Sequence, residues 1–395
     1  MILKKCRVCG LGKLKKVFSL GNQPLANNLE SEIIKSKKYP LELNLCKNCS
    51  NCQLTIAINS KKLFNKYLYK SSMSHSFINH FSKAADKYIK IFNLKKNSFI
   101  LDVGSNDGIG LMPYKQKNFV NIYGIEPATN LSKFSNKLGI KTYNAFLNNK
   151  LSEKLNNRFD LITASNVFAH VSNINEFTNC IKKMLRPNGI FIIEVQYLYR
   201  MLKDISFDNI YHEHVNYWSV SSLNYFFSKM NMKIFNVEEI NTHGGSIRVY
   251  VKKNENKKIK IRNCVKNFIK KEDKLKIQNI STYKIFNKKV IIKKKKIIKK
   301  MKKLYLKNYT IVGFGAPAKA TTLINFYKLQ KFIHYIIDDN ILKKNKFIPN
   351  TKIKITNKAK NKKIDYIVVF AWNYFNEIKK RNFRIARKFI NIFNT

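Results

Sequence analysis

The chain has 395 residues, of which 45% are apolar, so it is long enough for two or three folded domains and too apolar for a disordered protein. Its formal net charge is +53, but the lysines are spread along the whole chain and occur with much Asn, Ile, Phe and Tyr, as an AT-rich genome would produce. The charge alone therefore does not predict nucleic-acid binding, and it would suit an anionic small-molecule substrate. The chain has no apolar run of ~18 residues and no signal-like start, so we expect a cytoplasmic protein without a membrane partner.

Four of the seven cysteines form two CxxC pairs, Cys6-Arg-Val-Cys9 and Cys46-Lys-Asn-Cys49. In a reducing compartment such pairs indicate metal ligands rather than disulfides. Four thiolates suit a structural Zn²⁺, because they leave no open position for water. The segment is punctuated by Gly and Pro, so we expect it to bury little apolar area and to need the metal for folding. Residues 1–68 are therefore predicted to be a zinc-binding module.

Strands and helices alternate between residues 69 and 251. Apolar runs typical of strands, with helical stretches between them, lie at 99–103, 120–125, 159–163 and 189–194, and a closing strand is expected near 248–251. This alternation is typical of a doubly wound, mainly parallel sheet, so the fold class is α/β.

The rest of the chain is predicted to contain a linker and a second domain. Residues 252–305 are rich in Lys, with Ile at helical spacing, and predict one or two long amphipathic helices. From 306 to 395 a second Rossmann-like α/β domain is expected. Its strands are predicted at 309–312, 333–337 and 365–370, with a helix at 319–329.

The best-defined motif is Leu101-Asp-Val-Gly-Ser-Asn-Asp-Gly108, where an apolar run enters a glycine turn that opens a helix. A ligand can approach the backbone closely at such a turn. About twenty residues later the next run ends at Glu126, where an acidic side chain can accept hydrogen bonds from two ribose hydroxyls. The carboxylates Asp102 and Asp107 suit the cationic sulfonium and amino groups of S-adenosylmethionine better than a pyrophosphate. We therefore expect a Rossmann-like, class I methyltransferase domain whose cofactor-binding residues are Asp102, Gly104, Ser105, Asn106, Asp107, Gly108, Glu126 and Asn166.

A second group of polar residues follows the later strands. Asn166 and His170 end the third run and would face the reactive end of the cofactor, because ligands bind beyond the carboxyl ends of such strands. The segment Tyr211-His-Glu-His-Val215 follows the fourth run and is the densest titratable group in the chain. Two histidines and a carboxylate could bind a metal, although neighbours on one segment cannot all point at one ion. A structural His pair is a further alternative, and we favour a proton-transfer site.

Together these motifs resemble the sugar C-methyltransferases that act on nucleotide-linked 4-keto-deoxyhexoses. The resemblance covers nearly the whole chain and includes the loop at 104–108. The other matching segments are Cys6–Gly10, Leu20–Asn28, Tyr39–Cys49, Gln53–Leu54, Tyr67–Ser72, Asn166–His170, Tyr211–Val215, His243–Arg248, Gly313–Lys319, Ile336–Asp339 and Ala371–Asn373.

The resemblance implies the chemistry and the roles of residues. A base would remove a proton next to the ketone of a nucleotide sugar, and the resulting carbanion would take the methyl group. By resemblance His214 would be that base, and Glu213 would contact the sugar or orient its neighbours, whereas the residues alone do not rank His212 against His214. Tyr211, His170 and Tyr69 would surround the keto oxygen. The C-terminal domain would close over the sugar without a cofactor of its own, in a pathway of deoxysugar biosynthesis.

Two other functions fit parts of the chain. Gly313-x-Gly315-x-x-Ala318 follows a predicted strand and precedes Asp338 by about twenty residues, which alone would predict an NAD-dependent oxidoreductase. The lysines and the zinc module would also suit an RNA-directed methyltransferase, although no aromatic and basic recognition motif accompanies them. The sequence does not fix the oligomeric state, and a monomer is our working expectation.

Overall fold

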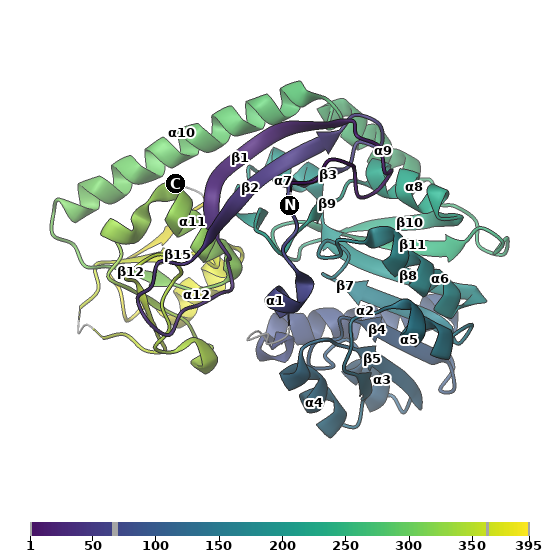
Figure 1. Ribbon diagram of the computed structural model, residues 1–395. Helices are drawn as coiled ribbons and strands as arrows, with labels where there is room; N and C mark the ends of the chain where they lie inside the picture. Colours follow the sequence, from purple (N-terminus) through teal and green to yellow (C-terminus); the bar gives the residue numbers. More distant parts are fainter. Residues whose placement is uncertain (1, 65–69, 361–362, 394–395) are drawn as a thin grey trace.

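Figure 1 shows the computed structural model, which describes residues 2–64, 70–360 and 363–393. Tyr69, one of the predicted catalytic residues, lies outside the described residues. In the described part the chain forms a four-stranded, a seven-stranded and a five-stranded sheet. The methyltransferase-type domain and the C-terminal domain lie on opposite sides of Figure 1, and a long helix passes above the C-terminal domain and the N-terminal hairpin.

The N-terminal sheet is built on a long antiparallel hairpin and includes a strand from much later in the chain. Its order is β1-β2-β3-β9, formed by β1 (Leu14–Pro24), β2 (Lys38–Cys46), β3 (Cys52–Leu54) and β9 (Asn216–Tyr217). The pairing of β3 with β9 is antiparallel. The first 64 residues therefore share their sheet with the segment that directly follows Tyr211–Val215.

The expectation that this segment buries little apolar area is wrong for its strands. Phe18, Leu43 and Leu45 are at most 3% exposed and belong to a core shared with the long helix. The ring of Phe18 lies 5.0 Å from that of Phe286, measured between centroids. The hairpin has a core because later parts of the chain cover it, which its own composition could not indicate.

The seven-stranded sheet confirms the predicted α/β class. Its order is β10-β11-β8-β7-β4-β5-β6, in which β11 is antiparallel to both of its neighbours, β10 and β8, and all other neighbouring strands are parallel. The strands are β4 (Phe99–Val103), β5 (Asn121–Ile125), β6 (Lys141–Tyr143), β7 (Phe159–Ser165), β8 (Leu185–Gln196), β10 (Met232–Ile240) and β11 (Ser246–Lys253). The chain leaves β4 toward β5 on one side and returns to β7 on the other, so the crevice at the switch point opens beside β4.

Helices cover both faces of this sheet. Neighbouring residues of β4 alternate between them: Ile100 packs in a cluster with Tyr88 of α2, whereas Leu101 packs in a cluster with Phe177 of α6 and Phe226 of α8. The helices of this part are α1 (Ser60–Phe64), α2 (His75–Phe92), α3 (Met112–Gln116), α4 (Thr129–Lys137), α5 (Asn149–Lys154), α6 (Ile174–Met184), α7 (Leu198–Lys203) and α8 (Val220–Lys229), with 3-10 turns η1 (Ser71–Met73) and η2 (Phe207–Asn209).

The predicted amphipathic linker is two helices, α9 (Cys264–Leu275) and α10 (Ile280–Tyr305). In Figure 1, α10 crosses above the β1–β2 hairpin and ends beside the C-terminal domain. Its buried side chains, among them Tyr283, Phe286 and Val290, fall on one face, and most of its lysines are exposed. The long basic helix therefore acts as a structural cover for the hairpin.

The C-terminal domain is also an α/β unit. Its sheet is parallel, with the order β14-β13-β12-β15-β16. The strands are β12 (Ile311–Phe314), β13 (Tyr335–Ile337), β14 (Lys354–Thr356), β15 (Tyr366–Val369) and β16 (Lys388–Asn391), and the helices are α11 (Ala318–Tyr327) and α12 (Phe375–Arg381), with 3-10 turns η3 (Leu329–Lys331), η4 (Ile341–Lys343) and η5 (Trp372–Tyr374). None of the helices described is both long enough and apolar enough to cross a bilayer.

Candidate functional site

The two CxxC turns have the same backbone geometry. In each turn the residue after the second cysteine, Gly10 or Ser50, has a positive φ and donates its N–H to the carbonyl of the first cysteine, at 2.9 and 3.0 Å. This places both thiols of each turn on the same side. The Cys6 and Cys49 thiols share a hydrogen bond, which lowers the pKa of Cys6 and raises that of Cys49.

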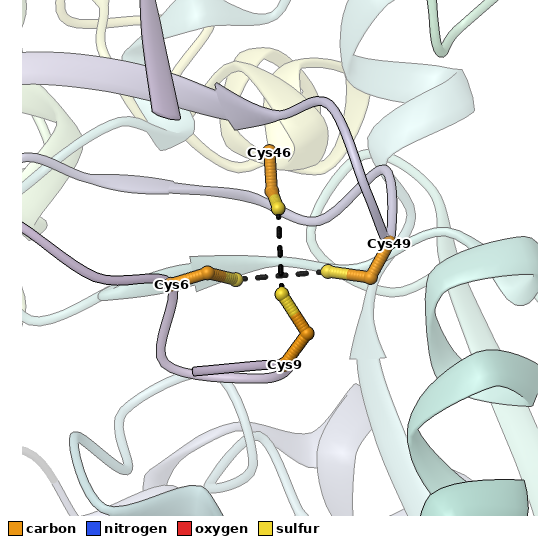
Figure 2. Close-up of side chains that lie close together, drawn as sticks. All are labelled: Cys6, Cys9, Cys46 and Cys49. Atoms are coloured by element: carbon orange, nitrogen blue, oxygen red, sulfur yellow. Dashed lines mark hydrogen bonds between the residues drawn. The ribbon is translucent and has the colours of Figure 1, made fainter. Parts of the chain in front are cut away.

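The four predicted metal ligands meet at one point (Figure 2). Their Sγ atoms all lie within 4.8 Å of one another, and the pairs Cys6–Cys49 and Cys9–Cys46 are each 3.6 Å apart. Four thiolates bound at ~2.3 Å to a tetrahedral Zn²⁺ would be about 3.8 Å apart. The donor set therefore fits a structural zinc ion.

The loop after β4 is shaped by close packing. Gly104 has φ +70°, and a Cβ atom there would lie 2.3 Å from Cγ2 of Val167. The N–H groups of Gly104 and Ser105 both donate to the carbonyl of Ile125, at 2.7 and 3.1 Å. A side chain at Gly104 would collide with Val167, which follows β7, so glycine is required at this position.

Two buried carboxylates face this loop. Glu126 accepts the N–H of Asn106 through one oxygen and the N–H of Ala128 through the other, each at 2.8 Å. Asp102 accepts the hydroxyl of Thr163 at 2.6 Å. Burial raises the pKa of both carboxylates, that of Asp102 to about 7. A cationic ligand beside them would stabilise their ionised forms, so the pair fits a positively charged nucleoside.

A cavity of about 820 Å³ lies at the carboxyl ends of β4, β5, β7 and β8. The predicted site residues that line it are Asp102, Gly104, Ser105, Asn106, Glu126, Asn166, His170, Tyr211 and His214. Of the others, Asp107 and Gly108 do not line it. Asp107 instead accepts hydrogen bonds from the N–H and the hydroxyl of Ser72, at 3.1 and 2.5 Å, and so ties η1 to the loop.

In the Tyr211–Val215 segment, the side chains of His212, Glu213 and His214 point in three different directions. His214 lines the cavity, where its Nε2 lies 2.7 Å from the Tyr211 hydroxyl and its Nδ1 lies 2.9 Å from the carbonyl of Asn209. Glu213 does not line the cavity and accepts a hydrogen bond from Asn27 at 2.7 Å. His212 packs against Tyr39, with a ring-centroid distance of 6.0 Å. The two histidines and the carboxylate therefore do not converge on one point.

Backbone hydrogen bonds hold the two histidine-bearing loops together. The N–H groups of Val215 and Asn216 donate to the carbonyl of Ala169, at 2.9 and 3.1 Å, and the N–H of Leu54 in β3 donates to the carbonyl of Val215 at 3.0 Å. As a result the rings of His170 and His214 lie 5.0 Å apart between centroids. Both imidazoles are neutral at pH 7, because burial lowers the pKa of His170 to about 4 and that of His214 well below 6.5.

The structure adds residues to the site that sequence reasoning did not assign. Asn27, in the Leu20–Asn28 motif, holds Glu213. Phe64 of α1 stacks on His170 with a centroid distance of 5.4 Å, and Phe77 and His243 also line the cavity. Asn27 and His243 lie within motifs that carried the resemblance, so the motif positions were the available signal. No sequence signal pointed to Phe64 and Phe77, because single aromatic residues are common in protein cores.

The loop after β12 repeats the geometry of the loop after β4. Asp338 accepts the N–H groups of Ala316 and Asn340, at 2.7 and 2.9 Å, as Glu126 does with Asn106 and Ala128. In addition, Lys343 lies 3.1 Å from the Asp338 carboxylate and donates to the carbonyl of Ala316 at 3.0 Å. Lys343 therefore bridges the Asp338 carboxylate and the Ala316 carbonyl at the position where an NAD ribose would bind.

Comparison with known proteins gives matches over most of the chain. Residues 6–64 match the family described as "Putative zinc binding domain", residues 77–237 match "Methyltransferase domain", and residues 241–392 match "C-methyltransferase C-terminal domain". The chain is 30% identical to C-methyltransferase NovU of Streptomyces niveus over 95% of its own length and 91% of that protein.

Solved structures of low sequence identity are also similar to part of the chain. PH0226 protein from Pyrococcus horikoshii OT3 is 11% identical, with a TM-score of 0.38 over 49% of this chain and 98% of that protein. A SAM-dependent methyltransferase from Aquifex aeolicus is 21% identical, with a TM-score of 0.34 over 42% of this chain and 87% of that protein.

The domain matches follow the order of the structural parts, and each agrees with a feature described above. The zinc-binding domain contains the four converging cysteines, and the methyltransferase domain contains the loop after β4 and most of the residues that line the cavity. The chain belongs to the C-methyltransferase family and is an S-adenosylmethionine-dependent methyltransferase with an N-terminal zinc-binding domain.

Proposed function

We propose that the protein methylates a carbon next to the ketone of a nucleotide-linked keto-deoxysugar. One observation carries the proposal: His214, the predicted base, lines the same cavity as Asp102 and Glu126, and its ring nitrogens are held by Tyr211 and the carbonyl of Asn209. A base and a cofactor site in one cavity are what carbon methylation requires. The resemblance to sugar C-methyltransferases supports the sugar as acceptor.

The cofactor would be held by the loop after β4 and its neighbours. Glu126 would accept hydrogen bonds from the ribose hydroxyls, since each carboxylate oxygen has a second lone pair free for them. Asp102 would face the amino group, and Asn166 would line the reactive end. Bound S-adenosylmethionine supplies an electrophilic methyl group on a sulfonium sulfur.

His214 is suited to remove the proton. A carbonyl only accepts hydrogen bonds, so Nδ1 carries the hydrogen that is donated to Asn209, and Nε2 is the unprotonated nitrogen. The hydroxyl of Tyr211 donates to this Nε2. A bound substrate would have to turn the hydroxyl away to reach Nε2, and the freed O–H could then donate to the keto oxygen.

The remaining predicted residues support this step. When the proton moves from carbon to Nε2 of His214, the C–H electron pair forms the carbon–carbon double bond and the oxygen becomes negative. The neutral imidazole of His170, 5.0 Å from that of His214 between centroids, is available as a further donor. Burial raises the pKa of Glu213 to about 7. We propose that Glu213 positions the Tyr211–Val215 segment through its hydrogen bond with Asn27.

Calorimetric titration with S-adenosylhomocysteine and then with thymidine diphosphate tests the proposed function. Binding of both, followed by transfer of labelled methyl to a thymidine-diphosphate-linked keto-deoxyhexose, is the expected result. Binding of the first alone, together with tight and steeply salt-dependent RNA binding, would support an RNA acceptor instead and contradict the proposal.

Replacing Glu126 with Ala is expected to weaken S-adenosylhomocysteine binding by about 1–3 kcal/mol, because charge-assisted hydrogen bonds to the ribose are lost. The measurement is the dissociation constant from calorimetry at pH 7.5. The matched control is Glu153→Ala, which removes an exposed glutamate paired with Lys183 and should leave affinity unchanged. Unchanged affinity in Glu126→Ala would place the ribose elsewhere.

The pH profile should reflect the buried state of His214. Burial and the neighbouring His170 hold the pKa of His214 below 6.5, so the neutral base persists above that pKa and is lost as the pH falls through it. We expect kcat/KM to stay level down to about pH 6.5 and to fall only at lower pH. An acid limb centred above pH 6.5, in protein shown to remain folded by circular dichroism, would contradict this.

A further inference from the structure

One strained residue in the cavity wall has no role in the mechanism above. His243 has φ +52°, and Gly244 and Gly245 follow it with φ of +86° and +116°. A non-glycine residue in this left-handed region is uncommon and costs conformational energy, although His tolerates it better than most residues. Such residues cluster at functional sites, where neighbouring structure holds them in place.

Contacts from three other elements hold this turn. Tyr197, directly after β8, donates its N–H to the carbonyl of Gly245 at 3.2 Å. Lys319 of α11 donates to the carbonyl of His243 at 3.3 Å. Trp372 of η5 packs so closely that a Cβ on Gly244 would lie 2.5 Å from its ring. The methyltransferase sheet and the C-terminal domain therefore fix the turn between them.

The turn directs the imidazole of His243 toward the cavity that holds the proposed base. His243 lines this cavity together with His170 and His214, and its ring lies 5.3 Å from that of Phe77 between centroids. Burial and the neighbouring Lys319 ammonium lower the pKa of His243 to about 3, so the ring is neutral at physiological pH. A neutral imidazole has one N–H that can donate a hydrogen bond, and it does not act as an acid that gives up this proton.

We propose that His243 is a further substrate-contacting residue, which donates a hydrogen bond to the oxygen that becomes negative during proton removal. The inference rests on the proposed function. As His214 takes the proton, the carbonyl π electrons move to the oxygen, and the N–H of His243 stabilises that charge without transferring its own proton. As the electron pair of the carbon–carbon double bond would form the bond to the methyl carbon, the methyl–sulfur bond would break and leave its pair on the sulfur. The oxygen electrons would then restore the carbonyl, and the hydrogen bond from His243 would weaken.

Two substitutions separate the imidazole from the strain of the backbone. His243→Gly removes the ring and is relaxed at positive φ, whereas His243→Asn keeps both an N–H donor and a residue that tolerates this conformation. We expect His243→Gly to lower kcat by about 10²- to 10³-fold with S-adenosylhomocysteine affinity within about threefold of wild type. His243→Asn should retain at least about a tenth of wild-type kcat. Added imidazole should partly restore the activity of His243→Gly.

Other outcomes overturn the inference in distinguishable ways. If wild type methylates the keto-sugar and His243→Gly does so at the same kcat, His243 has no such role and the proposed function stands. If His243→Gly loses S-adenosylhomocysteine affinity and keeps kcat at saturating cofactor, His243 belongs to the cofactor site. If wild type binds S-adenosylhomocysteine but methylates no keto-sugar, the proposed function fails and this inference fails with it.

Discussion

Replacement of His214 by Asn is expected to lower kcat by about 10²- to 10⁴-fold, the usual contribution of a general base. The amide nitrogen of Asn can still donate to the carbonyl of Asn209, as Nδ1 of His214 does at 2.9 Å. The segment should therefore keep its conformation while the proton acceptor is lost. The measurement is single-turnover methyl transfer at saturating cofactor and sugar, which excludes product release from the comparison.

The matched control lies two residues earlier in the same segment. His212 is also buried but does not line the cavity and packs against Tyr39. His212→Asn should reduce the melting temperature and leave kcat within a few-fold of wild type. If both variants lose activity equally, the loss reflects the fold of the segment. If His214→Asn retains full activity, another group is the base.

Loss of the zinc site is expected to have the largest effect on stability. A structural zinc ion contributes apparent binding free energies of ~10–16 kcal/mol, which is as large as the stability of a typical domain. We expect Cys46→Ser to yield protein without zinc by mass spectrometry of the metal and with a strongly lowered melting temperature. Wild type should contain one zinc ion per chain.

The same variant should also lose activity, although no cysteine of the metal site lines the cavity. Arg7, between the first two ligands, donates to the carbonyl of Leu54 at 2.7 Å and reaches that of Val215 at 3.4 Å. Disorder at the metal site would therefore release the segment that carries His214. The control is Cys264→Ser, whose hydroxyl can keep the hydrogen bond to Asn236. Stable, active and zinc-free Cys46→Ser protein would contradict a structural role for the metal.

The parts of the molecule that the sequence predicted are those encoded in contiguous residues. The loop from Leu101 to Gly108 combines strand, turn and helix signals in a single stretch, and the CxxC spacing directly determines which thiols share a turn. The strands that were predicted lie within a few residues of the observed ones, because parallel strands buried on both faces are apolar runs. Most of the predicted cavity residues also lie together, since strand ends of one sheet meet at one edge.

The rest depends on packing between distant segments, which no local pattern reports. The hydrogen bond between Asn27 and Glu213 joins residues 186 positions apart. The fixed position of His243 depends on Lys319 and Trp372, which belong to another domain. Asp107 has the residue type of a ligand contact, yet it holds Ser72, because the direction of a side chain in a tight turn depends on the neighbouring element.

Because β3 pairs with β9, the N-terminal sheet can be completed only after β9 has been synthesised. At about 5–20 residues per second, the roughly 160 residues between these strands take on the order of ten seconds to leave the ribosome. During that time the edge of β3 has no partner, and an open edge invites wrong pairing. All four cysteines of the metal site precede residue 50, so metal capture can close the two turns early and keep the nascent hairpin in register until its final strand emerges.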